Sequence, residues 1–252
     1  MLWGNKFTTS YYFLFLLSIL YCISEYSKRE RDIIWWVKYI IYAVFTMLFE
    51  IWIGCTTVFV ATILFFILII CKNKIKNIIC KRSFVIISMI ASGIVVNVME
   101  YILLNEYVQN IIVGLLGENL SLTGRTVVYS RYLYPLIYDS IWFGHGFSNT
   151  MLYQKTNVFF NVQNGFFDVI VNYGLLGLLF LLATVWMCVG KEISRKYGWG
   201  LYVLIYSLIL ASIIEVSYNF IFLLALYILI NIEKVSSPCA KEECVKRNYL
   251  QS

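Results

Sequence analysis

Charged residues are scarce in this sequence. Only 13% of its 252 residues are Asp, Glu, Lys or Arg, whereas 61% are apolar, and the mean hydropathy is +0.77. A soluble globular domain carries about a quarter of its residues as charged side chains, which keep its surface compatible with water. The composition therefore excludes an ordinary soluble domain and indicates a membrane protein that crosses the bilayer several times.

Clusters of metal-ligating residues are lacking as well. The chain has one histidine, His145, and its seven cysteines are dispersed. Cys239 and Cys244 form the one close pair in the tail, without a histidine or a second pair beside them, so we expect no zinc site, no metal and no cofactor. Six of the cysteines lie at or inside the predicted cytoplasmic boundary, where thiols stay reduced, and we expect no disulfide bonds.

Apolar runs of about 17 to 22 residues, long enough to cross a hydrocarbon core, follow one another along the chain. The first has only Lys6 before it and no small-residue cleavage site after it, so we interpret it as a retained span. Glu50 and Glu215 divide two longer runs into pairs. The sequence thus predicts an all-α polytopic membrane protein with seven transmembrane helices: Phe7–Ile23, Ile33–Phe49, Ile51–Cys71, Ser83–Leu104, Val169–Gly190, Gly198–Ile214 and Val216–Ile232.

The basic residues predict how these spans are oriented, because Lys and Arg in short loops stay on the cytoplasmic side. With the amino terminus outside, 16 of the 20 Lys and Arg residues fall on the cytoplasmic side, counting Lys38 as reaching that boundary from its span. The carboxyl terminus is then cytoplasmic. The predicted cytoplasmic segments are Ser24–Asp32, Lys72–Arg82, Lys191–Tyr197 and the tail from Glu233.

A long external loop, Asn105–Asp168, is left between the fourth and fifth spans. Long loops rich in aromatic residues are usually functional or form small packed units. Its segment Thr126–Phe143 contains Arg131, Pro135 and Asp139, which are costly at mid-membrane, so we expect an amphipathic helix at the membrane surface or packed between the spans, and not an eighth span. The predicted organisation is 1–104 and 169–232 as membrane regions, 105–168 as the external unit, and 233–252 as a tail.

Titratable and phosphate-binding side chains concentrate in this external loop. Arg125 follows Gly124 at the start of a candidate helix, and His145 stands between two glycines. Carboxylates also end four predicted spans on the outer side. These four are Glu50, Glu100, Asp168 and Glu215. Acidic and basic groups therefore share one level, as a membrane enzyme acting on a lipid-linked substrate requires.

Several motifs in this loop resemble, in order, those of the O-antigen ligase and polymerase family, which includes bacterial capsule and exopolysaccharide polymerases. They are Thr123-Gly124-Arg125, Gly144-His145-Gly146, Asn161-Val162-Gln163-Asn164-Gly165-Phe166-Phe167 and Tyr173-Gly174-Leu175-Leu176-Gly177. The resemblance covers about residues 120 to 185. With fewer spans than is usual in that family, the chain is expected to be a short or amino-terminally truncated member.

The resemblance implies a multi-pass protein of the bacterial inner membrane that transfers a glycan from undecaprenyl pyrophosphate to the hydroxyl of another lipid-linked repeat unit. It implies as partners the lipid-linked oligosaccharide, membrane lipids, and flippase and chain-length regulator proteins, with no nucleic acid. A polymerase is the favoured interpretation. An O-antigen-type ligase, a non-catalytic membrane fragment and a component of a polysaccharide transporter stay open as alternatives.

The residue types suit this chemistry without a metal. Arg125 is the first choice for the pyrophosphate, since arginine is always charged and offers a fork of donors, and Arg131 is a second phosphate contact. His145 is the candidate base, because histidine changes its charge near neutral pH. Gln163 stands where the family often has histidine and cannot act as a base, so Asp139 and Asp168 are the alternatives to His145. Gln163 and Asn164 are expected to donate hydrogen bonds to substrate.

Overall fold

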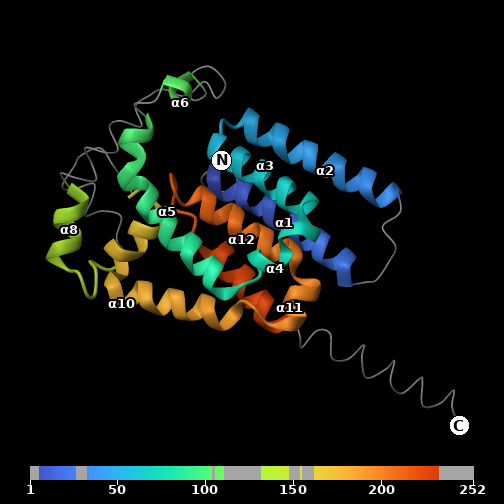
Figure 1. The fold of residues 1–252 in the computed structure, drawn as a ribbon. Coiled ribbons are helices and arrows are strands. Elements are labelled where there is room, and N and C mark those ends of the chain that lie inside the picture. The colour runs from blue at the N-terminus through green and yellow to red at the C-terminus, as the bar shows by residue number, and fades with distance from the viewer. Residues whose placement is uncertain are drawn as a thin grey trace, which may run out of the picture.

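The computed structural model describes residues 6–26, 33–103, 106–110, 132–147, 154 and 162–232 (Figure 1). This part of the chain is helical and holds no β-strand. Its helices are α1 Lys6–Tyr26, α2 Ile33–Trp52, α3 Thr56–Ile70, α4 Lys72–Ile79, α5 Arg82–Leu103, α6 Glu106–Asn110, α8 Tyr134–Asp139, α10 Gly165–Cys188, α11 Glu192–Tyr197, α12 Trp199–Ala211 and a last helix, Phe220–Ile232.

The prediction of an all-α membrane protein is confirmed at this level. Three helices, α1, α2 and α10, are each long and apolar enough to cross a membrane, and there are four such spans if the bent pair α3 and α4 is counted as one. The number of seven spans stays a prediction, because α12 and the last helix are shorter. At 1.5 Å per residue each extends only about 20 Å, less than the hydrocarbon thickness of about 30 Å.

Helix α12 is the centre of the molecule, with α1, α3 and α5 packed on it (Figure 1). Leu201, Leu204 and Leu208 are fully buried, and so are the residues on its other faces. A helix that is apolar all round is stable only where other helices or lipid surround it. The sequence WGLYVLIYSLILA of α12 meets this condition, and exposed apolar residues lie instead on the outer helices, among them α1, α2, α5 and α10.

The predicted division at Glu50 is confirmed as a break between α2 and α3, but the break lies beyond Glu50. Helix α2 continues to Trp52, and the turn comes at Gly54, whose φ of 64° favours glycine. Glu50 consequently lies in the last turn of α2 with no exposed surface. Its Oε1 accepts a hydrogen bond of 2.9 Å from Oγ1 of Thr62 on α3.

The division at Glu215 is also confirmed, as a turn between α12 and Phe220–Ile232. The two helices are antiparallel, because a Cβ added to Gly198, before α12, would lie 2.7 Å from Cδ2 of Leu229, near the end of Phe220–Ile232. Ser217 in the turn donates a 2.6 Å hydrogen bond to the carbonyl of Leu208. This turn is therefore tied into the bundle.

The predicted fifth span, Val169–Gly190, differs most from the structure. Its helix, α10, already begins at Gly165, so Asp168 belongs to its first turn and not to the preceding loop. At Gly174 the backbone leaves the helical conformation, with φ 68° and ψ −171°. The span is therefore two helical pieces joined at one residue, where an unbroken helix was predicted.

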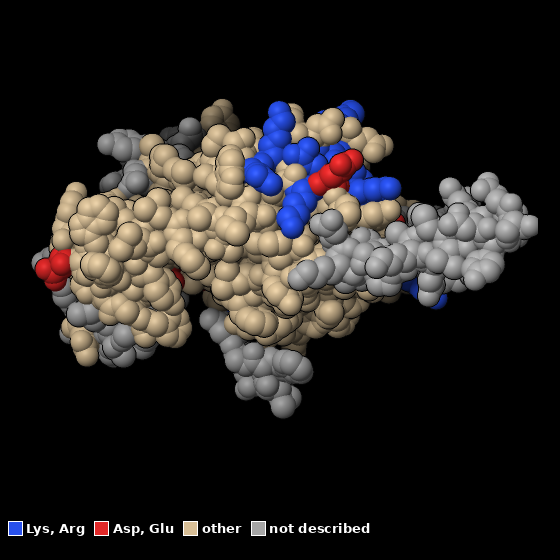
Figure 2. Space-filling view, turned by 90° about the horizontal axis from the view of Figure 1, so that it is seen from below, with Lys and Arg blue, Asp and Glu red and all other residues tan. Residues whose placement is uncertain are grey.

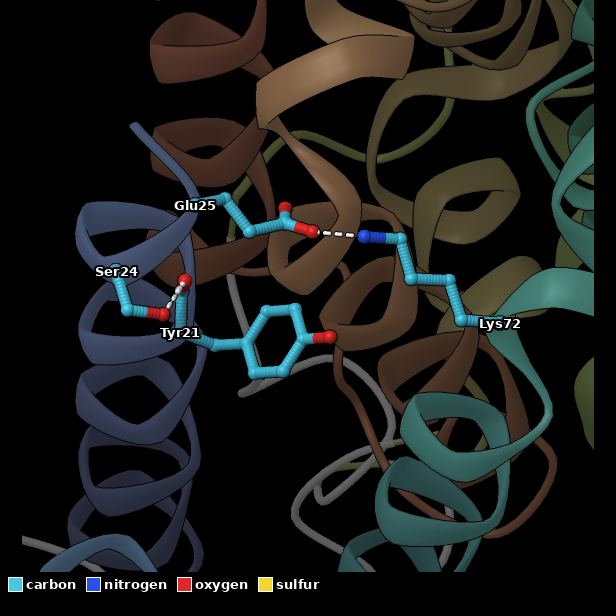
Figure 3. Close-up of polar contacts among 4 residues, drawn as sticks. All are labelled: Tyr21, Ser24, Glu25 and Lys72. Atoms are coloured by element: carbon cyan, nitrogen blue, oxygen red, sulfur yellow. Dashed lines mark hydrogen bonds and ion pairs between the residues drawn. The ribbon is translucent and has the colours of Figure 1, made fainter. Parts of the chain in front are cut away.

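Three of the predicted cytoplasmic segments meet at one end of the molecule. Nε of Arg82 donates a 2.8 Å hydrogen bond to the carbonyl of Val189. Lys72 forms an ion pair with Glu25, beside Tyr21 and Ser24 (Figure 3). The rings of Tyr26 and Tyr197 lie 5.7 Å apart. The ends of α1, α4, α5, α10 and α11 thus share one level.

Basic side chains gather at this end, over one part of a surface that is otherwise almost uncharged (Figure 2). Helix α4, KNKIKNII, turns through 105° from α3. An amphipathic helix at such an angle suits the plane of a membrane surface. The predicted orientation requires the basic segments to lie on one side of the membrane, and they do lie at one end of the molecule. That this end faces the cytoplasm stays a prediction.

The orientation can be tested with single cysteines at two exposed positions, Lys74→Cys on α4 and Tyr107→Cys on α6. In intact cells, a membrane-impermeant thiol reagent is expected to label Tyr107→Cys and to reach Lys74→Cys only after permeabilisation. The parent chain measures labelling of the native cysteines. Labelling of Lys74→Cys alone in intact cells would show that the orientation is inverted.

Candidate functional site

The break in α10 is held by the loop that follows α8. Backbone amides of His145 and Gly146 donate hydrogen bonds of 2.8 and 2.9 Å to the carbonyls of Val171 and Asn172. In return, Leu175 and Leu176 donate bonds of 2.8 and 3.2 Å to two loop carbonyls. The acceptors are Ile141 and Trp142. We call this set of four bonds, between residues 141–146 and 171–176, the loop–helix junction.

Two glycines make this close approach possible. A Cβ on Gly144 would lie 2.5 Å from the backbone of Asn172 and Tyr173, and a Cβ on Gly174 would lie 2.2 Å from the carbonyl oxygen of Trp142. Both residues also have positive φ, 69° and 68°. Gly174 thus permits the close approach of a loop. Any side chain at either position would push the two segments apart.

The junction supplies hydrogen bonds that a broken helix would otherwise lose. A buried backbone group without a partner costs about 1–3 kcal/mol in a protein interior, and lipid offers no water to replace the partner. Non-helical backbone inside a membrane protein is therefore found where other protein or a polar cavity covers it. Discontinuous helices of this kind often mark binding sites in transport proteins.

His145 is fixed on both its backbone and its side chain. Its amide belongs to the junction, and its Nε2 lies 2.7 Å from the carbonyl oxygen of Leu136 in α8. Ser140 closes the loop between them, because its hydroxyl donates a 2.6 Å bond to the carbonyl of Gly144, whose amide donates 2.9 Å back to the Ser140 carbonyl. The half-buried imidazole thus has a defined position.

A second, small hydrophobic core seats α8 on the first half of α10. Leu133 and Leu136 are buried there with Phe167, Ile170 and Val171. The ring of Tyr134 meets that of Phe167 edge to face, with centroids 6.1 Å apart. Burial, and to a lesser extent Tyr138, raises the pKa of Tyr134, so its phenol stays neutral near neutral pH. This core carries the loop of His145 and meets the main core at Leu181, Leu182 and Tyr218.

Asn164 begins α10 as a buried cap. Its Oδ1 accepts a 2.9 Å bond from the amide of Phe167, which is the usual role of asparagine at a helix start. Its Nδ2 donates to the carbonyl of Ser92 at 3.4 Å and to that of Ile213 at 3.2 Å. The one amide therefore joins α5, α10 and the turn after α12.

Further contacts reinforce this connection. The amide of Gly165 donates a 2.8 Å bond to the carbonyl of Ser212. The hydroxyl of Tyr218 accepts from Ser212 at 3.1 Å and lies 3.1 Å from the hydroxyl of Ser92. A Cβ on Gly93 would lie 2.4 Å from Cδ1 of Phe166, so this glycine makes room for the ring. Asn164 thus belongs to a polar junction inside the bundle.

The predicted site residues fall into separate places. Asp168 is half-buried, and the Asn172 side chain one turn later bonds to it, so Asp168 is linked through Asn172 to the loop of His145. Asp139 is exposed at the end of α8. Gln163 has a φ of 53° and is half-buried before α10. Arg125 and Arg131 lie outside the described residues.

His145 and Asn164 do not share one cluster. The loop of His145 bonds at Val171 and Asn164 precedes Gly165, so about 10 Å of helix separates them at 1.5 Å per residue. The structure joins His145 with Leu136, a contact that the sequence did not indicate. A helix that ends just before a glycine-flanked histidine is the signal that could have suggested it, since histidine often bonds the last carbonyls of a helix.

No family model matches this chain, and neither the curated proteins nor the solved structures include a significant match. The function must therefore be argued from the residues and their geometry.

Substitution of the junction glycines tests its role in stability. Gly174→Ala is expected to destabilise the protein by about 3 kcal/mol or more, because strained φ/ψ and the overlap with Trp142 add together. Gly146→Ala is the matched control: its φ is 81°, but nothing lies within 4 Å of the added Cβ, so only about 1–2 kcal/mol is expected. Thermal unfolding in detergent measures both. If the two variants lose the same stability, the close contact of Gly174 with Trp142 does not contribute to the stability of the protein.

Asn164→Ala tests whether this side chain holds helices together. It removes one helix cap and two hydrogen bonds to carbonyls of neighbouring elements, so a loss of about 2–4 kcal/mol is expected. Asn219→Ala, which removes the single bond from the amide of Ile221, should lose about 1 kcal/mol. Thermal unfolding compares them. If the Asn164→Ala protein is as stable as the wild type, Asn164 does not hold these helices together.

Proposed function

We propose that the chain is a membrane glycosyltransferase that polymerises oligosaccharide repeat units carried on undecaprenyl pyrophosphate. Its product would be capsular, O-antigen or exopolysaccharide at the outer face of the bacterial inner membrane. The observation that carries the proposal is the loop–helix junction. It brings together Gly144-His145-Gly146 and Tyr173-Gly174-Leu175-Leu176-Gly177, two of the motifs on which the resemblance to the O-antigen ligase and polymerase family rests.

Motifs that are distant in sequence and meet in space support a shared role. The third motif, through Gln163 and Asn164, begins the same helix, α10, and positions its first half against α5 and α12. One rigid unit therefore carries His145, Asp168 and the start of α10. Rigid placement favours catalysis, because a reacting group held in position spares the reaction much of its entropic barrier.

The reaction needs a cation for the leaving group and an acceptor for a proton. Pyrophosphate gains negative charge as the sugar–oxygen bond breaks, and donors placed for that charge supply several kcal/mol. Arg125 is proposed for this task, with Arg131 as a second contact; both are proposals from sequence. His145 is the proposed base, and Asp139 and Asp168 are the carboxyl alternatives. The reaction is proposed to need no metal.

The proposal is tested by deleting the gene and complementing with wild type, Arg125→Ala, His145→Ala or Arg195→Ala, followed by gel analysis of surface polysaccharide. Long polymer should disappear in the deletion strain and return with wild type. It should stay absent, or fall at least about 100-fold, with Arg125→Ala and His145→Ala. Arg195→Ala, on the distant α11, is the control for loss of a basic residue and should restore polymer.

Each outcome separates the alternatives. Long polymer that persists in the deletion strain would refute the polymerase. Loss of polymer with continued transfer of single repeat units favours polymerase over ligase, because a ligase acts on both. If Arg125→Ala and His145→Ala both restore long polymer fully, at normal protein levels in the membrane, their catalytic roles are refuted. The non-catalytic membrane fragment is then the interpretation that remains.

A further inference from the structure

We infer that the carbonyl of Leu136 holds His145 in the tautomer protonated at Nε2, and that Nδ1 is the atom that accepts the proton of the acceptor sugar. This inference rests on the proposed function and names the reacting atom of its base. The geometry carries it. A carbonyl oxygen can only accept, so the 2.7 Å contact requires a hydrogen on Nε2. In neutral imidazole the other nitrogen, Nδ1, is then an acceptor.

The position of Leu136 explains why its carbonyl is available. Helix α8 ends at Asp139, and the carbonyls of its last turn have no partner within the helix. His145 reaches back to one of them because Ser140 folds the loop through its paired bonds with Gly144. Leu136 itself is fully buried in the small core, so its backbone is held firmly. Its carbonyl is a positioning group and touches no substrate.

The other ring nitrogen is left for the reaction. Among the residues that the structure describes, none forms a hydrogen bond with Nδ1, and the side chain is half-buried. A sugar hydroxyl that reaches Nδ1 therefore displaces no hydrogen-bond partner among these residues.

The step balances as follows. The acceptor hydroxyl gives its proton to Nδ1 while its oxygen forms a bond to the anomeric carbon of the donor. The bond from that carbon to the pyrophosphate oxygen breaks, and the pyrophosphate leaves with the electron pair. The ring is then an imidazolium, whose Nε2–H bond to the Leu136 carbonyl becomes charge-assisted and stronger. Water takes the proton from Nδ1 and restores the starting tautomer.

A pair of amide variants separates the two nitrogens. In His145→Gln the amide nitrogen can take the place of Nε2 and keep the bond to Leu136, but no base remains. In His145→Asn the shorter amide sits near the place of Nδ1 and cannot reach Leu136. We expect His145→Gln to unfold close to the wild-type temperature and His145→Asn to unfold at a lower one. Both should lose at least about 100-fold in kcat, as removal of a general base does.

Polymerisation is measured on the purified full chain in liposomes with undecaprenyl-pyrophosphate repeat units, with Asn219→Ala as the control. That variant loses one bond at the start of Phe220–Ile232 and keeps the loop of His145, so it should unfold earlier and retain kcat at low temperature. If wild type makes no polymer, the proposed function fails. If wild type makes polymer and His145→Gln keeps its kcat, only the inference about the base fails.

The tautomer has a readout that does not depend on activity. Since His145 is the one histidine of the chain, protein labelled with ¹⁵N-histidine gives the nitrogen signals of a single imidazole. We expect hydrogen on Nε2, slow to exchange with water, and none on Nδ1 in the neutral ring. Hydrogen on Nδ1, or rapid exchange of the Nε2 hydrogen, would overturn the assignment.

Discussion

The exchange of backbone hydrogen bonds between the loop after α8 and the interrupted helix α10 is the constraint on which this structure depends. An apolar helix cannot break inside a membrane protein unless its freed amides and carbonyls find partners. Here the partners come from residues 141–146, and the loop in turn has no regular structure of its own without the helix. Each segment therefore requires the other, and His145 is placed by this mutual requirement.

The two ends of the first half of α10 have different tasks. At its start, Asn164 joins α10 to α5 and to the turn after α12, so this end is anchored in the main bundle. At its other end, near Gly174, the loop–helix junction holds the loop of His145, and α8 packs on the small second core. A rigid half-helix thus connects a structural anchor with a candidate reacting group about 10 Å away.

Much of the fold could be predicted from the sequence. The apolar runs and the acidic residues within them placed both hairpins, since Glu50 and Glu215 interrupt stretches too long for one crossing. The basic segments were predicted to lie together, and the contacts of Arg82 with Val189 and of Lys72 with Glu25 bring three of them to one end. These features depend on local composition and charge, which a sequence displays directly.

Features that depend on distant partners could not be predicted. The run from Val169 to Gly190 is mostly apolar and gives no sign of a break, and the break at Gly174 exists because Trp142, more than thirty residues earlier, approaches it. Asn164 was expected to face substrate, but its carbonyl partners, Ser92 and Ile213, lie far away in sequence. For His145, the flanking glycines suggested an accessible turn, whereas the bond to Leu136 follows from where α8 ends.

The central claim is that the loop–helix junction lies at the reacting end of a lipid-linked sugar. Photocrosslinking measures this most directly, with an undecaprenyl-pyrophosphate oligosaccharide that carries a diazirine on the sugar next to the pyrophosphate, followed by mass spectrometry of the crosslinked peptides. The account predicts crosslinks to residues 139–147 and to the first half of α10. Crosslinks concentrated in α1, α2 and α3, with none at residues 139–147, would contradict it.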